Sequence, residues 1–129
     1  MRLLVDTHAW LWMLSSPDRI PARTRGQLAD PAVDVLVSAA TAWEIAIKYE
    51  LGKLPLPEHP TTWVPDRIER TGSTPLAVEH EHALRAGALP RHHRDPFDRL
   101  LVAQSQALDM PLVSADAALD AYDVVLAWD

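Results

Sequence analysis

Four acidic side chains, far apart in the sequence, follow expected strands or lie within the first two turns of expected helices. They are Asp6, Glu44, Asp98 and Asp116. In a parallel α/β sheet, sites form beyond the carboxyl ends of the strands, so these residues are expected to meet at one edge. Carboxylates gathered there repel one another, and a cation makes the cluster tolerable near neutral pH. Oxygen ligands suit hard ions, so we expect Mg²⁺ or Mn²⁺ and phosphoryl chemistry.

Each acid also has an ordinary structural explanation. Asp6 and Asp116 could cap the helices that follow them. Glu44 could pair with Lys48 one turn later, an interaction worth roughly 0.3–0.5 kcal/mol. Asp98 could favour the positive end of its helix. Taken singly, these explanations compete with a shared site; taken together, they do not explain why four acids fall at one edge.

The segment around Asp98 is a well-marked helix start. Asp95 is a capping residue type, and Pro96 follows where its missing N–H costs nothing. Apolar residues then recur at helical spacing, which places Asp98 beside Leu101 and Val102 rather than on a polar flank. A carboxylate in such a poorly solvated place must be hydrogen-bonded, capped or bound to a cation.

Basic side chains surround Asp98 in the sequence and could contact a nucleic-acid backbone. They are Arg91, His92, His93, Arg94 and Arg99, with Lys48 as a further candidate. On composition alone, a solvated loop is the better explanation of the run at 91–94, but its place beside the expected acidic edge favours a backbone contact. Arg99 could instead pair with an acid. His8 is expected to be packed or to support the acids rather than to bind a cation.

Length and composition indicate one globular domain spanning residues 1–129. The net charge of −6, from 12 Lys and Arg against 18 Asp and Glu, opposes general nucleic-acid affinity, so an RNA or DNA substrate needs a local basic patch or a metal. The absence of cysteine excludes disulfides, zinc–thiolate sites and thiol nucleophiles. No targeting segment or membrane-length apolar run is visible, and we expect a cytoplasmic protein.

Short apolar runs alternate with helical patterns along the chain. Strands are expected at 3–5, 33–37, 74–78, 110–113 and 123–126, and helices at 8–14, 21–29, 39–51, 61–70, 79–88, 95–109 and 114–119. This alternation predicts a parallel α/β sheet covered on both faces. Pro65 fits its helix only in the first turn. Trp10, Trp12 and Trp43 are expected in the core or at a dimer contact.

Other chemistries are less well supported. There is no G-x-S-x-G elbow for a serine hydrolase and no glycine cluster to hold a phosphate. A phosphatase with Asp6 as its nucleophile would want an acid two residues later, where His8 stands. A receiver domain would want a late lysine, and no lysine follows Lys53.

Four stretches resemble PIN-domain proteins and, more narrowly, VapC-type toxins of type II toxin–antitoxin systems. They are LLVDTHAWLW, VSAATAWEIAIKYELGKL, HRDPFDRLLVAQSQAL and PLVSAD, in this order and spacing. The likeness covers nearly the whole chain, and HRDPFDRLLVAQ is its specific part. The resemblance implies an α/β fold, a PIN-like three-layer sandwich with a central, mostly parallel sheet flanked by helices.

The resemblance also implies roles for particular residues. Asp6, Glu44, Asp98 and Asp116 match the acids that bind Mg²⁺ or Mn²⁺, and Thr7 and Ser114 match polar positions that support them. Where the family often has Thr and a basic residue before the last acid, this chain has Ser114 and Ala115. Asp95 also matches an acid of the subgroup, although its capping role explains it.

As to function, the resemblance implies a metal-dependent endoribonuclease toxin that cleaves RNA phosphodiester bonds, often in structured RNA such as tRNA. It implies a homodimer and a VapB-type antitoxin whose tail blocks the acidic pocket. The alternative is a non-catalytic PIN-fold module that binds RNA or protein. The intact set of acids argues against this alternative, because a decayed site would tolerate losing one.

Overall fold

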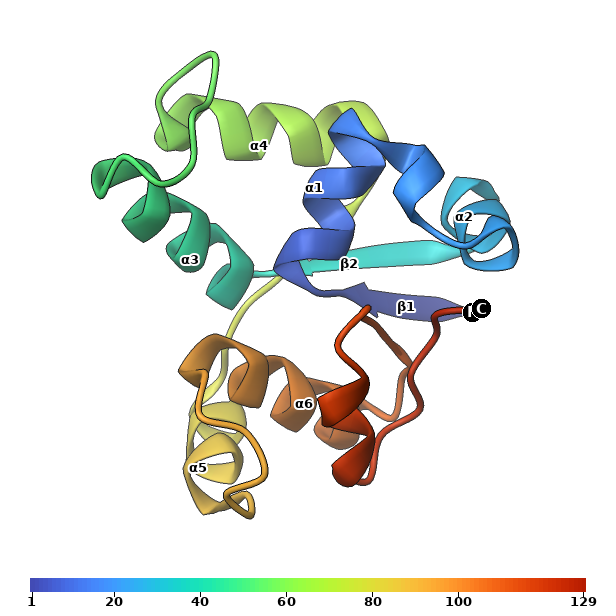
Figure 1. Ribbon diagram of the computed structural model, residues 1–129, viewed down its shortest axis with the longest axis vertical. Coiled ribbons are helices and arrows are strands. Elements are labelled where there is room, and N and C mark those ends of the chain that lie inside the picture. The colour runs from blue at the N-terminus through green and yellow to red at the C-terminus, as the bar shows by residue number, and fades with distance from the viewer.

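A central parallel sheet of four strands organises the computed structural model, which describes all 129 residues (Figure 1). The strands are β1 (Arg2–Val5), β2 (Asp34–Ser38), β3 (Thr74–Leu76) and β4 (Leu112–Val113). Their spatial order is β3-β2-β1-β4, and every neighbouring pair is parallel. The carboxyl ends of all four strands therefore meet at one edge.

Helices cover both faces of this sheet. They are α1 (Thr7–Ser15), α2 (Ala22–Ala29), α3 (Ala39–Glu50), α4 (Pro60–Thr71), α5 (His80–Ala88) and α6 (Pro96–Leu108), with 3₁₀ turns η1 (Pro17–Arg19) and η2 (Ala117–Ala121). In Figure 1, α1, α2 and α4 lie on one side of the strands, and α5, α6 and the C-terminal segment lie on the other. The expected α/β three-layer fold is confirmed.

Two hydrophobic cores result from the alternation of side chains along the strands. Leu3 and Val5 of β1 pack into the core beneath α1, α3 and α4, whereas Leu4 packs into the core with α6. Successive strand residues point to opposite faces, so a strand covered on both sides must be apolar throughout. This requirement explains the uninterrupted run LLV.

The predicted helix starts are confirmed at two capping residues. The Ser38 hydroxyl accepts a hydrogen bond from the amide of Ala40 (3.0 Å). The Asp95 carboxylate accepts hydrogen bonds from the amides of Phe97 (2.8 Å) and Asp98 (3.4 Å). These caps fix where α3 and α6 begin, and thereby where Glu44 and Asp98 lie.

The prediction that Pro65 fits only in the first turn of its helix was wrong, because α4 accommodates it past that turn. Pro60 occupies the first helical position, and Pro65 lies inside the helix. Pro65 cannot donate to the carbonyl of Thr61. Both residues are exposed, so water can hydrate the unpaired carbonyl.

The C-terminal segment contains less regular structure than expected. The expected strand 123–126 is reduced to a single bridge between Leu126 and Leu112. The expected helix 114–119 is η2, and its cap is Asp116 rather than Ser114. The Asp116 carboxylate accepts the amide hydrogen bond that starts this turn, which moves the start two residues along the chain.

The tryptophans divide between core and surface. Trp10 is fully buried in the core, which was one of the two expected places, whereas Trp43 is 60% exposed. No helix combines the length and apolar character that crossing a membrane would need.

Candidate metal centre

A cavity of about 310 Å³ lies at the carboxyl end of β1, and three of the four predicted acids line it. Its wall consists of Asp6, His8, Trp12, Asp98, Ala115 and Asp116. The parallel topology places these acids together: Asp6 directly follows β1, and Asp116 follows the neighbouring β4. Asp98 reaches the cavity from the first turn of α6.

Asp6 is both a helix cap and a cavity residue. Its Oδ1 accepts a hydrogen bond from the amide of Ala9 (2.8 Å), as the capping explanation expects. Burial raises the pKa of Asp6 above its usual value; hydrogen bonds from Ser114 and Ala9 and the nearby His8 oppose this shift, and the charge of Glu44 adds to it. The ionised form of Asp6 is therefore disfavoured in the folded protein unless a cation is near.

Asp98 is perturbed in the same direction. Its side chain is 22% exposed. The pKa of Asp98 is raised to about 7, chiefly by burial and also by the negative charges of Asp95, Asp6 and Glu44, whereas His93 lowers it. This shift is what a divalent cation would reverse, because a cation favours the ionised carboxylate.

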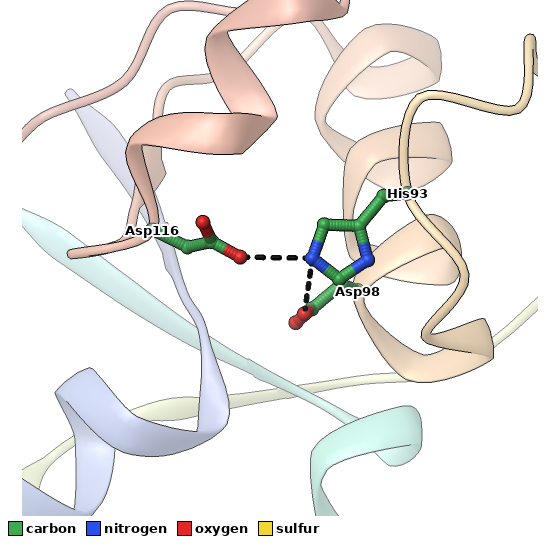
Figure 2. A group of neighbouring side chains, drawn as sticks. All are labelled: His93, Asp98 and Asp116. Carbon is green, nitrogen blue, oxygen red and sulfur yellow. Dashed lines mark hydrogen bonds and ion pairs between the residues drawn. The ribbon is translucent and has the colours of Figure 1, made fainter.

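His93 lies between two of the acids (Figure 2). Its Nε2 is 2.8 Å from Oδ2 of Asp116 and 3.5 Å from Oδ2 of Asp98. Its Nδ1 accepts a hydrogen bond from the amide of Asp95 (3.1 Å), so Nε2 carries the proton that faces Asp116. One ligand-type atom from each of His93, Asp98 and Asp116 lies within 4.8 Å of the other two. Because Nε2 of His93 is a donor here, an ion at this place would be held by the two carboxylates.

This placement of His93 was not predicted from the sequence, where it was expected to contact RNA. The ring enters the acid cluster from the loop that precedes α6, and no spacing rule for metal ligands signals that position. The only sequence signal was its nearness to Asp95 and Asp98.

Ser114 and Thr7 both contact the acidic residues. The Ser114 hydroxyl accepts a hydrogen bond from the amide of Asp116 (3.1 Å). The Thr7 hydroxyl donates to Oε1 of Glu44 (2.6 Å). These contacts fit the supporting roles that the resemblance implies for the two residues.

Glu44 is close to the cavity but does not line it. Its side chain is almost fully buried, and Oε2 accepts from Nζ of Lys48 (2.6 Å), which is the pairing that the ordinary explanation expected. With Thr7 on its other oxygen, both oxygens of Glu44 are engaged within the protein. Its charge still raises the pKa of Asp6 and Asp98.

The basic residues around α6 line a second hollow, of about 500 Å³. They are Arg91, His93, Arg94 and Arg99. Arg99, expected to contact RNA or to pair with an acid, forms no ion pair. Its guanidinium donates instead to the carbonyls of Ala86, Leu89, Pro90 and His93 and to the Tyr122 hydroxyl, over 2.8–3.3 Å. The geometry therefore gives Arg99 a role in holding the 86–93 segment.

The donor set fits a hard divalent cation. Three carboxylates line one cavity. Carboxylate oxygens suit Mg²⁺ and Mn²⁺. The raised pKa values of Asp6 and Asp98 point the same way, because burial disfavours their ionised forms and a bound cation would favour them.

Comparison with known proteins agrees with this architecture. The PIN domain family profile matches residues 3–125. Ribonuclease VapC16 from Mycobacterium tuberculosis is 54% identical over 59 residues, which cover 46% of this chain and 42% of that protein. The match thus spans less than half of that relative's length.

Solved structures with this fold include toxin–antitoxin complexes. VapBC2 from Rickettsia felis, solved with a DNA fragment from its promoter, has a TM-score of 0.74 at 14% identity and covers 100% of both chains. A toxin–antitoxin complex from Klebsiella pneumoniae has a TM-score of 0.63 at 16% identity, over 97% of this chain and 96% of that one. FitAcB from Neisseria gonorrhoeae has a TM-score of 0.60 at 18% identity, over 96% and 95%. At such identities the likeness shows a common fold.

Proposed function

Because the chain belongs to the PIN domain family, we propose that it is a metal-dependent endoribonuclease of the VapC toxin type, which hydrolyses RNA phosphodiester bonds. The observation that carries the proposal is the convergence of Asp6, Asp98 and Asp116 on one cavity, with His93 between two of them. The similarity to Ribonuclease VapC16 supports RNA as the substrate class.

Asp98 and Asp116 would hold the cation, with Asp6 on the same cavity wall and Nε2 of His93 donating to Asp116. A bound Mg²⁺ or Mn²⁺ would lower the pKa of a water and neutralise charge on the scissile phosphate. Glu44, proposed from the resemblance as a fourth acid of the site, would add its negative charge beside the cavity while Thr7 and Lys48 hold its oxygens.

The protein side chains would position reactants rather than attack the phosphate. The cavity wall contains no serine, threonine or cysteine side chain that could form a covalent intermediate. The buried Ser114 hydroxyl is engaged by the Asp116 amide. Water is therefore the nucleophile in this proposal, and the carboxylates orient it for in-line attack.

Two partners follow from the family assignment. We propose that a VapB-type antitoxin neutralises this chain in the cytoplasm, as the toxin–antitoxin complexes among its structural neighbours suggest. We also propose a homodimer. The exposed Trp43 indole, edge-on to Phe97 at 5.2 Å between ring centroids, supplies the type of aromatic surface that dimer contacts use.

The direct test is cleavage of RNA, tRNA included, by the purified chain. With Mn²⁺ or Mg²⁺ the wild-type chain should cleave, and EDTA should stop the reaction. Asp98→Asn should lose at least about 100-fold in rate, the size of effect expected when an electrostatic contact at the reacting centre is removed. Asp120→Asn, which removes one charge from an exposed position of η2, should cleave normally.

Two outcomes would count against the proposal. Cleavage by Asp98→Asn at the wild-type rate would remove the catalytic assignment. RNA binding by the wild-type chain without cleavage under either metal would indicate the non-catalytic binding module instead.

A further inference from the structure

The hollow lined by Arg91, His93, Arg94 and Arg99 is a concentration of positive charge in an acidic protein. No acidic side chain lines it. None of the three arginines forms an ion pair, whereas most other arginines of the chain do. Their charges are therefore not neutralised within the protein.

The backbone around the hollow is fixed before any ligand binds. Arg99 donates only to carbonyl groups and one hydroxyl, so it orders the segment and keeps its full charge. The Tyr122 hydroxyl donates to the carbonyl of Pro90 (2.8 Å) and accepts from the amide of His93 (3.0 Å). Arg91 and Arg94 extend from this fixed backbone as exposed side chains.

His93 connects the positive hollow to the acidic cavity. His93 lines the hollow, and its Nε2 contacts Asp116 and Asp98 of the cavity. A ligand that spans both places must offer negative charge to the arginines and also to a cation held by the acids. Consecutive phosphates of a nucleic-acid strand meet both conditions.

We propose that this hollow is a phosphate subsite that binds the RNA backbone next to the phosphate being cleaved; this rests on the proposed function. Arg91 and Arg94 would supply guanidinium groups, whose paired donors match phosphate oxygens. The subsite would give a protein with a net charge of −6 its local affinity for RNA.

The test measures binding of a fluorescent single-stranded RNA of about 12 nucleotides in EDTA, where cleavage is absent. The double variant Arg91→Gln/Arg94→Gln should bind at least about 10-fold more weakly than the wild-type chain. The slope of the logarithm of RNA affinity against the logarithm of salt concentration should be smaller by about 1.4 for this variant, since each of two lost phosphate contacts on a single strand contributes about 0.7. The matched control, Arg23→Gln/Arg25→Gln, removes the same charge from α2, at the other end of β2 from α3 (Figure 1), and should bind like the wild-type chain.

Further measurements separate this proposal from its alternatives. Mn²⁺ affinity should be the same in the double variant and the wild-type chain, because neither arginine belongs to the acid cluster. Equal RNA binding by the double variant and the wild-type chain, or an equal loss in the control pair, would overturn the subsite. If the double variant binds RNA normally but no longer binds an acidic peptide, the hollow binds a protein ligand and the phosphate subsite is overturned. If the wild-type chain cleaves RNA and the double variant binds RNA equally well, the subsite alone is refuted. If the wild-type chain neither binds nor cleaves RNA, the proposed function is refuted.

Discussion

Replacing Asp98 by Asn should stabilise the metal-free protein at alkaline pH. The pKa of Asp98 rises in the fold from 3.8 to about 7, chiefly because of burial. The folded protein therefore binds a proton at Asp98 more tightly than the unfolded chain does. Stability from this group is fully present below about pH 4 and is lost as pH rises through about 7. Asn has the shape of the carboxyl group without its charge, so it avoids this loss.

The size of the effect follows from the shift. A shift of about 3 pKa units at about 1.36 kcal/mol each gives at most about 4 kcal/mol at pH 8, falling to about 2 kcal/mol at pH 5. The Asp98 side chain is 22% exposed, and water screening reduces both figures. The gain in unfolding free energy for Asp98→Asn should thus be about 2–4 kcal/mol at pH 8 and about half as large at pH 5.

Urea unfolding of both proteins in EDTA at the two pH values measures this difference. Asp120→Asn should show no comparable gain, because its side chain is exposed. Added Mn²⁺ should stabilise the wild-type chain at pH 8 and leave Asp98→Asn almost unchanged. The reasoning fails if Asp98→Asn is no more stable than wild type at pH 8, or if its advantage is the same at both pH values.

Three further substitutions test the contacts around the site. Thr7→Val leaves Oε1 of the buried Glu44 without its donor and should lower the free energy of unfolding by about 1–3 kcal/mol. Thr7→Ser keeps the hydroxyl and should lose less stability. Equal losses of stability in the two variants would contradict the role of this hydrogen bond. In Arg99→Lys the lysine cannot reach all five acceptors, so the free energy of unfolding should fall by about 2–3 kcal/mol and hydrogen exchange at the His93 amide should become faster. Unchanged hydrogen exchange at this amide would refute a role of Arg99 in holding the loop. His93→Gln replaces the imidazole that donates to Asp116 and should weaken Mn²⁺ and Mg²⁺ binding to the same extent, as measured by calorimetry; a loss confined to Mn²⁺ would make His93 a nitrogen ligand and contradict this role.

The sequence predicted the parallel sheet because its strands are uninterrupted apolar runs between helical patterns. That topology was enough to expect Asp6 and Asp116 at one edge, since Asp6 directly follows β1 and Asp116 comes shortly after β4. The Asp95–Pro96 cap placed Asp98 in the first turn of α6, and the structure directs its side chain into the same cavity.

Contacts between residues far apart in the sequence determine the features of the site that the sequence did not predict. His93 reaches the acid cluster because Arg99 and Tyr122 fix the path of its loop, and no local pattern encodes those contacts. Glu44 lies beside the cavity rather than in its wall because Thr7 and Lys48 hold both of its oxygens. Helical spacing predicted the pairing of Glu44 with Lys48, but no local pattern signalled the contact with Thr7, which comes from another helix.

The central claim is that acids distant in sequence form one cation site at the carboxyl edge of the sheet. Anomalous diffraction from crystals soaked in Mn²⁺ tests it most directly. The account predicts a peak within coordination distance of Asp98 and Asp116, in the cavity that Asp6 also lines. An empty cavity at saturating Mn²⁺, with the ion bound elsewhere or nowhere, would contradict it.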